Sequence, residues 1–352
     1  MLQSIRAAFI GLAKHIYNNY PGLVKRMGLL ELLTLEPYKS YYLKRIDQKM
    51  SEFNQGAIAV EFEVTNKCNA DCIMCPNGIM QRPIEKMEMD LFKRIADEFA
   101  AENLPLIKFV FAGIGEPTLD PLLADKIRYL KEKMPQIPVQ LTTNASLLNE
   151  RRSKELIDAG LDRLIISFNG TTKESYEKVM GQMNFDKNMQ NVLKFLSLRQ
   201  NSKPHVTISC VRLDANAADF ASMQEFWKSK GVEVDSYKTP VPFNRGGDQM
   251  QSRYKSKWSL PKPSSPRQML PCRMMGENIL IHPNGKVVLC FVDYEEQIIM
   301  GELEKNSLRE ILSAKKKIFE QQKAGDFSKM PLCNNCSFMR EQTVAWWQDT
   351  YF

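Results

Sequence analysis

The sequence contains no run of 18 apolar residues, so we expect no segment that spans a lipid bilayer. Residues 1–22 lack both a continuous apolar core and a small-residue cleavage site, so we expect no secretory signal. There is no internal repeat, no low-complexity tract and no motif that interleaves aromatic and basic residues for RNA binding. These absences predict a cytoplasmic protein without a nucleic-acid partner.

The composition is that of an ordinary globular protein. Hydrophobic residues make up 43% and charged residues 25% of the 352 residues. One hydrophobic core rarely extends over a chain of this length, so we expect two domains or one large α/β domain with an appendage. The net charge of +7 is mild and fits an anionic substrate, a membrane surface or simple solubility.

Eight cysteines stand mostly in clusters along the chain. They occupy positions 68, 72, 75, 210, 272, 290, 333 and 336. In a long chain without a secretory signal, clustered cysteines are more typical of metal ligands than of disulfides, which implies a reducing compartment.

Residues 1–55 are predicted to form a basic, helical N-terminal arm. Within residues 1–34, apolar residues recur every three to four positions, and no acidic residue precedes Glu31. Residues 1–20 would either lie on an anionic membrane as a peripheral amphipathic helix or dock on the rest of the protein.

Residues 56–245 alternate short apolar runs with helical patterns. The apolar runs are 57–64, 106–111, 138–143, 163–168, 205–211 and 232–237, and helix-like segments cover 88–102, 120–134, 147–159, 172–199 and 216–230. This alternation predicts α/β architecture, with βαβ units around a parallel sheet. Six such units can curl into a partial (β/α)6 barrel with its functional loops at the C-terminal ends of the strands.

The remainder of the chain is predicted to form a small α+β domain. Residues 246–270 carry the prolines and serines of a linker. In residues 271–340, two strand-like runs flank the turn "PNG", which predicts a hairpin, and an amphipathic helix follows near 307–323. Residues 341–352 are an aromatic tail.

Cys68, Cys72 and Cys75 lie in "CNADCIMCPNG", directly after the first apolar run. Thiolates favour iron–sulfur clusters, zinc or copper(I), but a structural zinc site needs four ligands and no fourth cysteine or histidine is near. A [4Fe–4S] cluster held by three cysteines would leave one iron free for another ligand. From the spacing alone, zinc and a redox-active thiol pair remain alternatives.

The CxxxCxxC spacing of these cysteines resembles the signature of radical S-adenosylmethionine (SAM) enzymes. The resemblance implies that SAM chelates the open iron through its amino and carboxylate groups. An electron from a reductant such as flavodoxin or ferredoxin would then cleave SAM to methionine and a 5′-deoxyadenosyl radical. That radical would abstract hydrogen from a small-molecule substrate. The cofactor would supply the chemistry, and the protein would position the cofactor against the substrate.

The segment "GIGEP" follows the second apolar run. It is similar to the GGEP motif of radical SAM enzymes, with Ile114 in place of one glycine. The resemblance implies that Gly113, Gly115 and Glu116 bind the SAM ammonium group, where a carboxylate beside a cation is physically reasonable.

Two further motifs follow the third and fourth apolar runs. "TTNAS" resembles the TNG segment of the family and offers Thr143 and Asn144 as SAM contacts. "SFNG" resembles the S-x-D-G segment, with Asn169 in place of the acid, and implies that Ser167 and Asn169 bind the ribose hydroxyls.

Cys272, Cys290, Cys333 and Cys336 have the spacing C-x17-C-x42-C-x2-C. Four cysteines complete the ligand set of one metal centre, which is either an iron–sulfur cluster or a zinc ribbon. The pattern resembles the Twitch domain, the shortened relative of the SPASM domain, and implies an auxiliary [4Fe–4S] cluster. A cluster without a free iron cannot chelate substrate, so its expected role is electron transfer.

Cys210 belongs to neither set. In "HVTISCVRL", Ile208, Cys210 and Arg212 share one face of the run, and Thr207 and Ser209 share the other. If the first face points into the barrel, Cys210 would return hydrogen to a substrate radical and Arg212 would meet a carboxylate or phosphate. If the second face points inward, Cys210 is a packed core thiol, which is the orientation we favour.

The sequence therefore predicts a radical SAM oxidoreductase. It is similar to enzymes of the 2-deoxy-scyllo-inosamine dehydrogenase type, which implies oxidation of an alcohol on a sugar, a cyclitol or a related metabolite. A radical epimerase that uses Cys210 is a second hypothesis, and a peptide-modifying maturase is a third. The non-enzymatic alternative is a zinc-binding interaction module.

Overall fold

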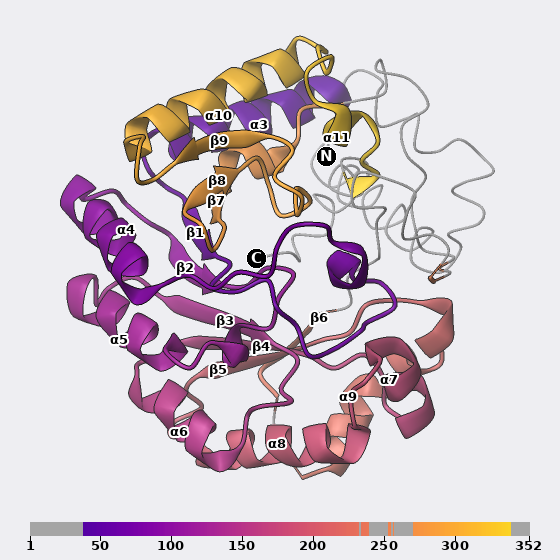
Figure 1. The fold of residues 1–352 in the computed structure, drawn as a ribbon. Helices are drawn as coiled ribbons and strands as arrows, with labels where there is room; N and C mark the ends of the chain where they lie inside the picture. Colours follow the sequence, from indigo (N-terminus) through magenta and orange to yellow (C-terminus); the bar gives the residue numbers. More distant parts are fainter. Residues whose placement is uncertain (1–37, 232–233, 239–252, 255, 257–269, 339–352) are drawn as a thin grey trace, which may run out of the picture.

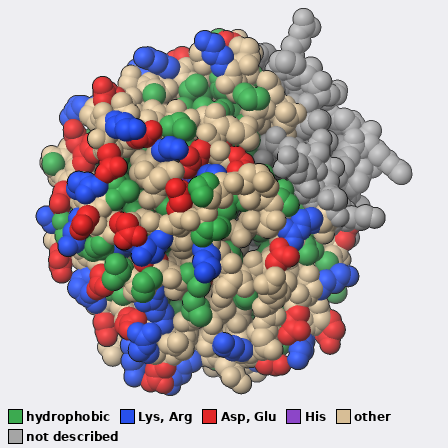
Figure 2. Space-filling view, viewed as in Figure 1, with side chains coloured by type: hydrophobic (Ala, Val, Ile, Leu, Met, Phe, Trp, Pro, Cys, Tyr) green, Lys and Arg blue, Asp and Glu red, His purple; other side chains and the backbone are tan. Residues whose placement is uncertain are grey.

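The computed structural model describes residues 38–231, 234–238, 253–254, 256 and 270–338 (Figure 1). The expected helix of residues 1–34 and its membrane contact, most of the expected linker and the aromatic tail lie outside the described residues. No helix in the described part of the chain has the length and apolar character needed to cross a membrane. On the face drawn in Figure 2, basic and acidic side chains are interspersed.

Six parallel strands form the centre of the fold, as the alternating pattern predicts. They are β1 (Ala59–Phe62), β2 (Lys108–Phe111), β3 (Val139–Thr143), β4 (Arg163–Ser167), β5 (His205–Ser209) and β6 (Ser236–Lys238). Strands that follow one another in the chain are also neighbours in the sheet. All six therefore end at the same edge, which brings the loops after them together.

Helices cover the outer face of this curved sheet (Figure 1). They are α4 (Met89–Glu102), α5 (Leu123–Lys133), α6 (Glu150–Asp158), α7 (Lys173–Met180), α8 (Phe185–Leu198) and α9 (Asp219–Ser229). The segment 172–199, expected as one helix, is two. Helix α7 ends at Gly181, which has a φ of +49°, and Asn184 caps the start of α8 by accepting a hydrogen bond from the Lys187 backbone N–H.

The core lies between the strands and the helices. Phe62 of β1 contacts Phe92 of α4 with ring centroids 5.0 Å apart, and Phe109 of β2 meets Phe99 of α4 edge to face. Because side chains alternate along a strand, the residues between these aromatic rings point to the opposite face of the sheet. Glu61 is one of them, so the concave face carries polar groups.

The C-terminal region continues the same sheet. Strand β7 (Asn278–Ile281) pairs parallel with β1, and β8 (Lys286–Val288) and β9 (Ile299–Glu302) extend the edge antiparallel, giving nine strands in the order β6-β5-β4-β3-β2-β1-β7-β8-β9. The expected hairpin is β7–β8, whose turn contains Gly285 with a φ of +81°. Helix α10 (Leu308–Lys323) lies beside α3 (Figure 1), and α11 (Pro331–Asn334) follows.

The helix before the barrel packs on this C-terminal region. Helix α3 (Tyr38–Asn54) contacts the 3-10 turn η6 (Arg273–Gly276) and α10. The Tyr42 hydroxyl donates a 2.7 Å hydrogen bond to the Pro271 carbonyl, and Lys323 of α10 pairs with Asp47 at 2.6 Å. Helix α3, before β1, thus packs directly on the C-terminal region of the described chain.

Candidate active site

The cysteine loop follows β1 at the C-terminal edge of the sheet. Cys68, Cys72 and Cys75 are all half-buried, and the Cys75 N–H donates to the Cys72 carbonyl at 3.0 Å. The short helix η2 (Pro76–Ile79) ends the loop. The backbone therefore turns so that three thiols come from one compact segment.

These thiols are placed where they ionise poorly on their own. Burial raises the pKa of Cys68 to about 11, and it raises that of Cys72 well above the usual range. Cys75 adds to both shifts, as expected for thiols close enough to repel one another when ionised. Coordination of a metal cluster removes this penalty because the bound thiolates are stabilised by iron. The donor set fits a cluster held by three cysteines.

The "GIGEP" loop lies directly against the cysteine loop. The Glu116 N–H donates to the Lys67 carbonyl at 2.8 Å, and the Asn77 side chain donates to the Ile114 carbonyl at 3.1 Å. A side chain at Gly115 would place its Cβ 2.0 Å from the Thr65 carbonyl oxygen. Only glycine permits this approach, which explains the second glycine of the motif.

The Glu116 carboxylate is buried and fully engaged by the protein. One oxygen accepts hydrogen bonds from the Thr143 hydroxyl at 2.7 Å and from the Thr118 N–H at 3.0 Å, and the other accepts from the Asn144 N–H at 2.7 Å. Burial raises its pKa, opposed by these bonds. Glu116 therefore joins "GIGEP" to "TTNAS", and its expected contact with SAM stays a prediction.

The "TTNAS" loop is joined to the cysteine loop through Asn69. The Asn144 amide donates to the Asn69 side-chain oxygen at 2.9 Å, and the Asn69 amide donates to the Ser146 hydroxyl at 2.8 Å. Asn69 lies between Cys68 and Cys72, so this exchange fixes the cysteine loop against the end of β3. The three motifs after β1, β2 and β3 therefore form one hydrogen-bonded group.

The "SFNG" segment also turns its polar side chain inward. Asn169 is buried; its oxygen accepts from the Val211 N–H at 2.7 Å, and its amide nitrogen lies 2.8 Å from the Met180 sulfur. Met180 in turn lies 3.8 Å from the Cys72 sulfur. Ser167 is half-buried at the end of β4. The ribose contacts expected for Ser167 and Asn169 remain predictions.

Cys210 lies in the core between the sheet and the helices. Like Val206 and Ile208 it is fully buried, and its sulfur accepts from the Asn216 amide at 3.5 Å. Burial raises its pKa well above the usual range. Arg212 extends over the ring of Phe220, with 5.7 Å from the guanidinium carbon to the ring centroid. The catalytic roles considered for Cys210 and Arg212 stay predictions.

The four C-terminal cysteines form a second, more deeply buried set. Cys272 precedes η6, Cys290 follows β8, and Cys333 and Cys336 lie in and after α11; each is less than 9% exposed. Burial raises the pKa of Cys290 to about 11 and those of Cys272 and Cys333 well above the usual range, and these thiols also act on one another. The set fits a cluster ligated entirely by protein.

No group of three or more His, Cys, Asp or Glu side chains in the described chain is arranged to hold a single metal ion. A multinuclear cluster separates its thiolate ligands further than one ion does, so the two cysteine sets are compatible with this finding. Two separate thiol sets on a partial α/β barrel fit an iron–sulfur protein with one set of three cysteine ligands and one set of four.

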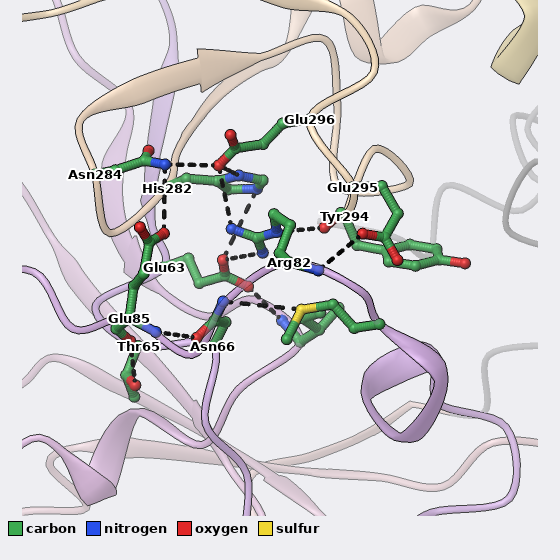
Figure 3. Close-up of polar contacts among 12 residues, drawn as sticks. Glu63, Thr65, Asn66, Arg82, Glu85, His282, Asn284, Tyr294, Glu295 and Glu296 are labelled. Carbon is green, nitrogen blue, oxygen red and sulfur yellow. Dashed lines mark hydrogen bonds and ion pairs between the residues drawn. The ribbon is translucent and has the colours of Figure 1, made fainter.

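A buried ionic network joins the segments on either side of the cysteine loop to His282, after β7, and Glu296, between β8 and β9 (Figure 3). Arg82 lies 2.6 Å from Glu63 and 3.3 Å from Glu296, and His282 lies 3.1 Å from Glu296. Burial acts to raise the pKa of Glu296, but bonds from His282, Lys286 and Asn284 outweigh it and hold the pKa well below its usual range. This network was not predicted from the sequence, where its one signal is that Glu61 and Glu63 alternate with apolar residues in the first run.

Comparison with known families identifies two domains in the chain. The radical SAM superfamily model matches residues 62–226, and a second model, the iron–sulfur cluster-binding SPASM domain, matches residues 272–337. The chain therefore contains a radical SAM domain followed by a C-terminal SPASM domain. Its cofactors are SAM and iron–sulfur clusters.

Relatives differ in the reactions that their names describe. A 2-deoxy-scyllo-inosamine dehydrogenase from Niallia circulans is 25% identical over 81% of this chain and 94% of its own length. An aldehyde ferredoxin oxidoreductase cofactor-modifying protein from Pyrococcus furiosus is 27% identical over 49% of this chain, and a PqqA peptide cyclase from Bradyrhizobium diazoefficiens is 29% identical over 49%. The chain spans about half the length of these two, at 48% of each.

A solved structure shares the fold. The crystal structure of BtrN in complex with AdoMet and 2-DOIA superposes with a TM-score of 0.55 at 19% identity, covering 79% of this chain and 92% of that one. The similarity shows that the sheet and its helices have the same arrangement in both proteins.

Proposed function

We propose that the protein dehydrogenates an alcohol on a small metabolite such as a sugar or cyclitol. The observation that carries the proposal is the closed set of four buried cysteines on an extension of the sheet that carries the cysteine loop. A centre ligated entirely by protein is suited to electron transfer, and oxidation of an alcohol needs an acceptor for a second electron. The relative matched over nearly its whole length is a dehydrogenase.

In this proposal, Cys68, Cys72 and Cys75 hold the SAM-binding [4Fe–4S] cluster, and Cys272, Cys290, Cys333 and Cys336 hold the auxiliary one. When bound, these groups supply reductive cleavage of SAM to a hydrogen-abstracting radical and an acceptor for one electron. The protein keeps the three motif loops in register through Asn69 and Glu116. A reductant such as flavodoxin or ferredoxin provides the initiating electron.

The position of Cys210 favours oxidation over epimerisation. An epimerase needs a hydrogen donor that reaches the substrate radical, and Cys210 lies on the helix side of β5 among core residues. A peptide-modifying reaction is the second candidate, because the PqqA peptide cyclase is also a relative.

The test uses the full chain, purified and reconstituted without oxygen. Candidate alcohols are screened for release of 5′-deoxyadenosine, and the product is identified by mass spectrometry. A dehydrogenase consumes one SAM per ketone formed and loses product formation on Cys333→Ala. Two hydrogens leave the alcohol, one to 5′-deoxyadenosine and one as a proton, so the product gains no solvent deuterium.

Three results would contradict the proposal. Protein that contains zinc but no iron or sulfide would indicate the interaction module. A product of unchanged mass that carries solvent deuterium would indicate an epimerase. Turnover only with a peptide, and none with alcohols, would indicate a maturase.

A further inference from the structure

Helix α10 carries two polar side chains on its buried face. Lys315 is 0% exposed and Gln322 is 1% exposed, whereas their neighbours on that face are apolar, with Ile311 and Phe319 both buried. The spacing of seven residues places Lys315 and Gln322 two turns apart on the same side of the helix. A lysine is almost never fully buried unless something compensates its charge.

Gln322 contacts two cysteines of the closed set. Its side-chain oxygen accepts a 2.9 Å hydrogen bond from the Cys272 N–H, and its amide nitrogen lies 3.5 Å from the Cys333 sulfur, within range of an N–H···S bond. These cysteines belong to segments separated by helix α10 itself. Gln322 therefore contacts Cys272 and Cys333, and it points an N–H donor at the Cys333 sulfur.

Lys315 places a positive charge on the same buried face of α10, two turns from Gln322. Its ammonium donates to the Asn278 carbonyl and lies 5.5 Å from the centroid of the Phe53 ring. No carboxylate of the described residues forms an ion pair with it. Burial lowers its pKa to about 8, and the groups that oppose this lowering are Cys290 and Cys272 first, then Glu277 and Glu61. Cys290 and Cys272 are thus within electrostatic range of the Lys315 ammonium.

We propose that Lys315 and Gln322 raise the reduction potential of the auxiliary cluster. Reduction adds negative charge at the four cysteines, and a buried ammonium stabilises that charge strongly because the interior has a low dielectric constant. Net charge and hydrogen bonds to sulfur are two of the factors that set the potential of an iron–sulfur cluster. The effect favours electron acceptance by the cluster, and the inference rests on the cysteine assignment of the proposed function.

The test measures a potential rather than activity. The background variant carries Cys68→Ala, Cys72→Ala and Cys75→Ala, so that only the auxiliary cluster contributes to the signal of the reconstituted full chain. Potentiometric titration followed by electron paramagnetic resonance compares Lys315→Met, Lys315→Arg and Gln322→Leu in this background. Lys317→Met is the matched control, because Lys317 is exposed on the same helix.

We expect Lys315→Met to lower the midpoint by ~59 mV or more, which is a tenfold change in the ratio of reduced to oxidised cluster for one electron. Gln322→Leu shifts it in the same direction by a smaller amount. Lys315→Arg, which keeps the charge, and Lys317→Met change the ratio by less than about threefold.

Equal midpoints for the background, Lys315→Met and Gln322→Leu would overturn this inference while leaving the proposed function intact. If Lys315→Met binds no iron, Gln322→Leu decides, and an unchanged midpoint there overturns the inference. Absence of any cluster from the triple-alanine background would remove the four-cysteine assignment and, with it, both proposals.

Discussion

The guanidinium Nη2 of Arg82 lies 2.6 Å from the carboxylate Oε2 of Glu63, and both side chains are at least 95% buried. The second Glu63 oxygen accepts a 2.9 Å hydrogen bond from the Ile114 N–H, in the "GIGEP" loop. The second Arg82 nitrogen faces Glu296 of the SPASM region. Arg82 and Glu63 therefore connect the segments that flank the cysteine loop with the "GIGEP" loop and the region of the second thiol set.

Replacement of Arg82 tests this connection. We expect Arg82→Met to lower the free energy of unfolding by about 3–5 kcal/mol, because it leaves buried carboxylates without their cation. Urea denaturation of the iron-free protein measures the loss. The matched control is Arg94→Met, since Arg94 of α4 also pairs with the SPASM region, at Glu304, but on the surface. A loss there of about 0–1 kcal/mol is expected, and equal losses in the two variants would contradict the prediction.

Acid should weaken the same network. Hydrogen bonds hold the folded-state pKa of Glu296 well below its usual value of 4.5. A depressed carboxyl pKa contributes stability above the unfolded-state pKa, and this contribution is lost as the pH falls from 4.5 towards the folded-state value. Thermal melts of the iron-free protein should therefore fall more steeply below pH 4.5 for the wild type than for Glu296→Gln. Parallel curves for the two proteins would refute this.

Gly115 should not tolerate a side chain. Its Cβ would overlap the Thr65 carbonyl oxygen at 2.0 Å, so Gly115→Ala must displace the backbone before the cysteine loop. We expect a loss of about 1–3 kcal/mol of stability, together with reduced iron content in the first set. Gly325→Ala is the comparison, since nothing lies within 4 Å of that position, although its φ of +77° adds strain. Normal iron loading of Gly115→Ala would show that the close approach is not required.

Cys210 should be dispensable for the reaction. Cys210→Ala removes a buried sulfur and should cost roughly 1 kcal/mol of stability, because the small cavity lies among core residues. Iron content and the rate of 5′-deoxyadenosine release should match those of the wild type. Abolished turnover in a folded, iron-loaded Cys210→Ala protein would favour the epimerase hypothesis over the dehydrogenase.

The sequence predicted the parallel sheet because its signals are local. Each apolar run has the length of a strand, each intervening segment has helical periodicity, and βαβ connections are right-handed. The motifs that follow these strands lie close together because parallel strands end at one edge of the sheet. The break between α7 and α8 was missed because Gly181 must approach the Asp71 carbonyl, a contact that is 110 residues distant in the chain.

The hydrogen-bond partners of polar side chains within the protein were not predicted from the sequence. Glu116 and Asn169 are expected to contact SAM, which stays a prediction, and the structure adds that their side chains bond to neighbouring loops. A carboxylate or amide in a motif has several hydrogen-bonding positions, and the sequence does not say which neighbours reach them first. Which neighbours form these hydrogen bonds depends on how closely the loops approach one another in the folded chain.

By itself, the sequence determined the resemblance to radical SAM enzymes, the α/β class and the two thiol sets. Cysteine spacing and strand–helix alternation depend only on residues that are near one another in the chain. Only the tertiary structure decided that β7 pairs with β1 to make one continuous sheet, that Arg82 meets Glu63 and Glu296, and that Lys315 lies buried on the face of α10 from which Gln322 contacts Cys272 and Cys333. These contacts join residues up to about two hundred positions apart, and burial in a shared interior, not periodicity, sets their energies.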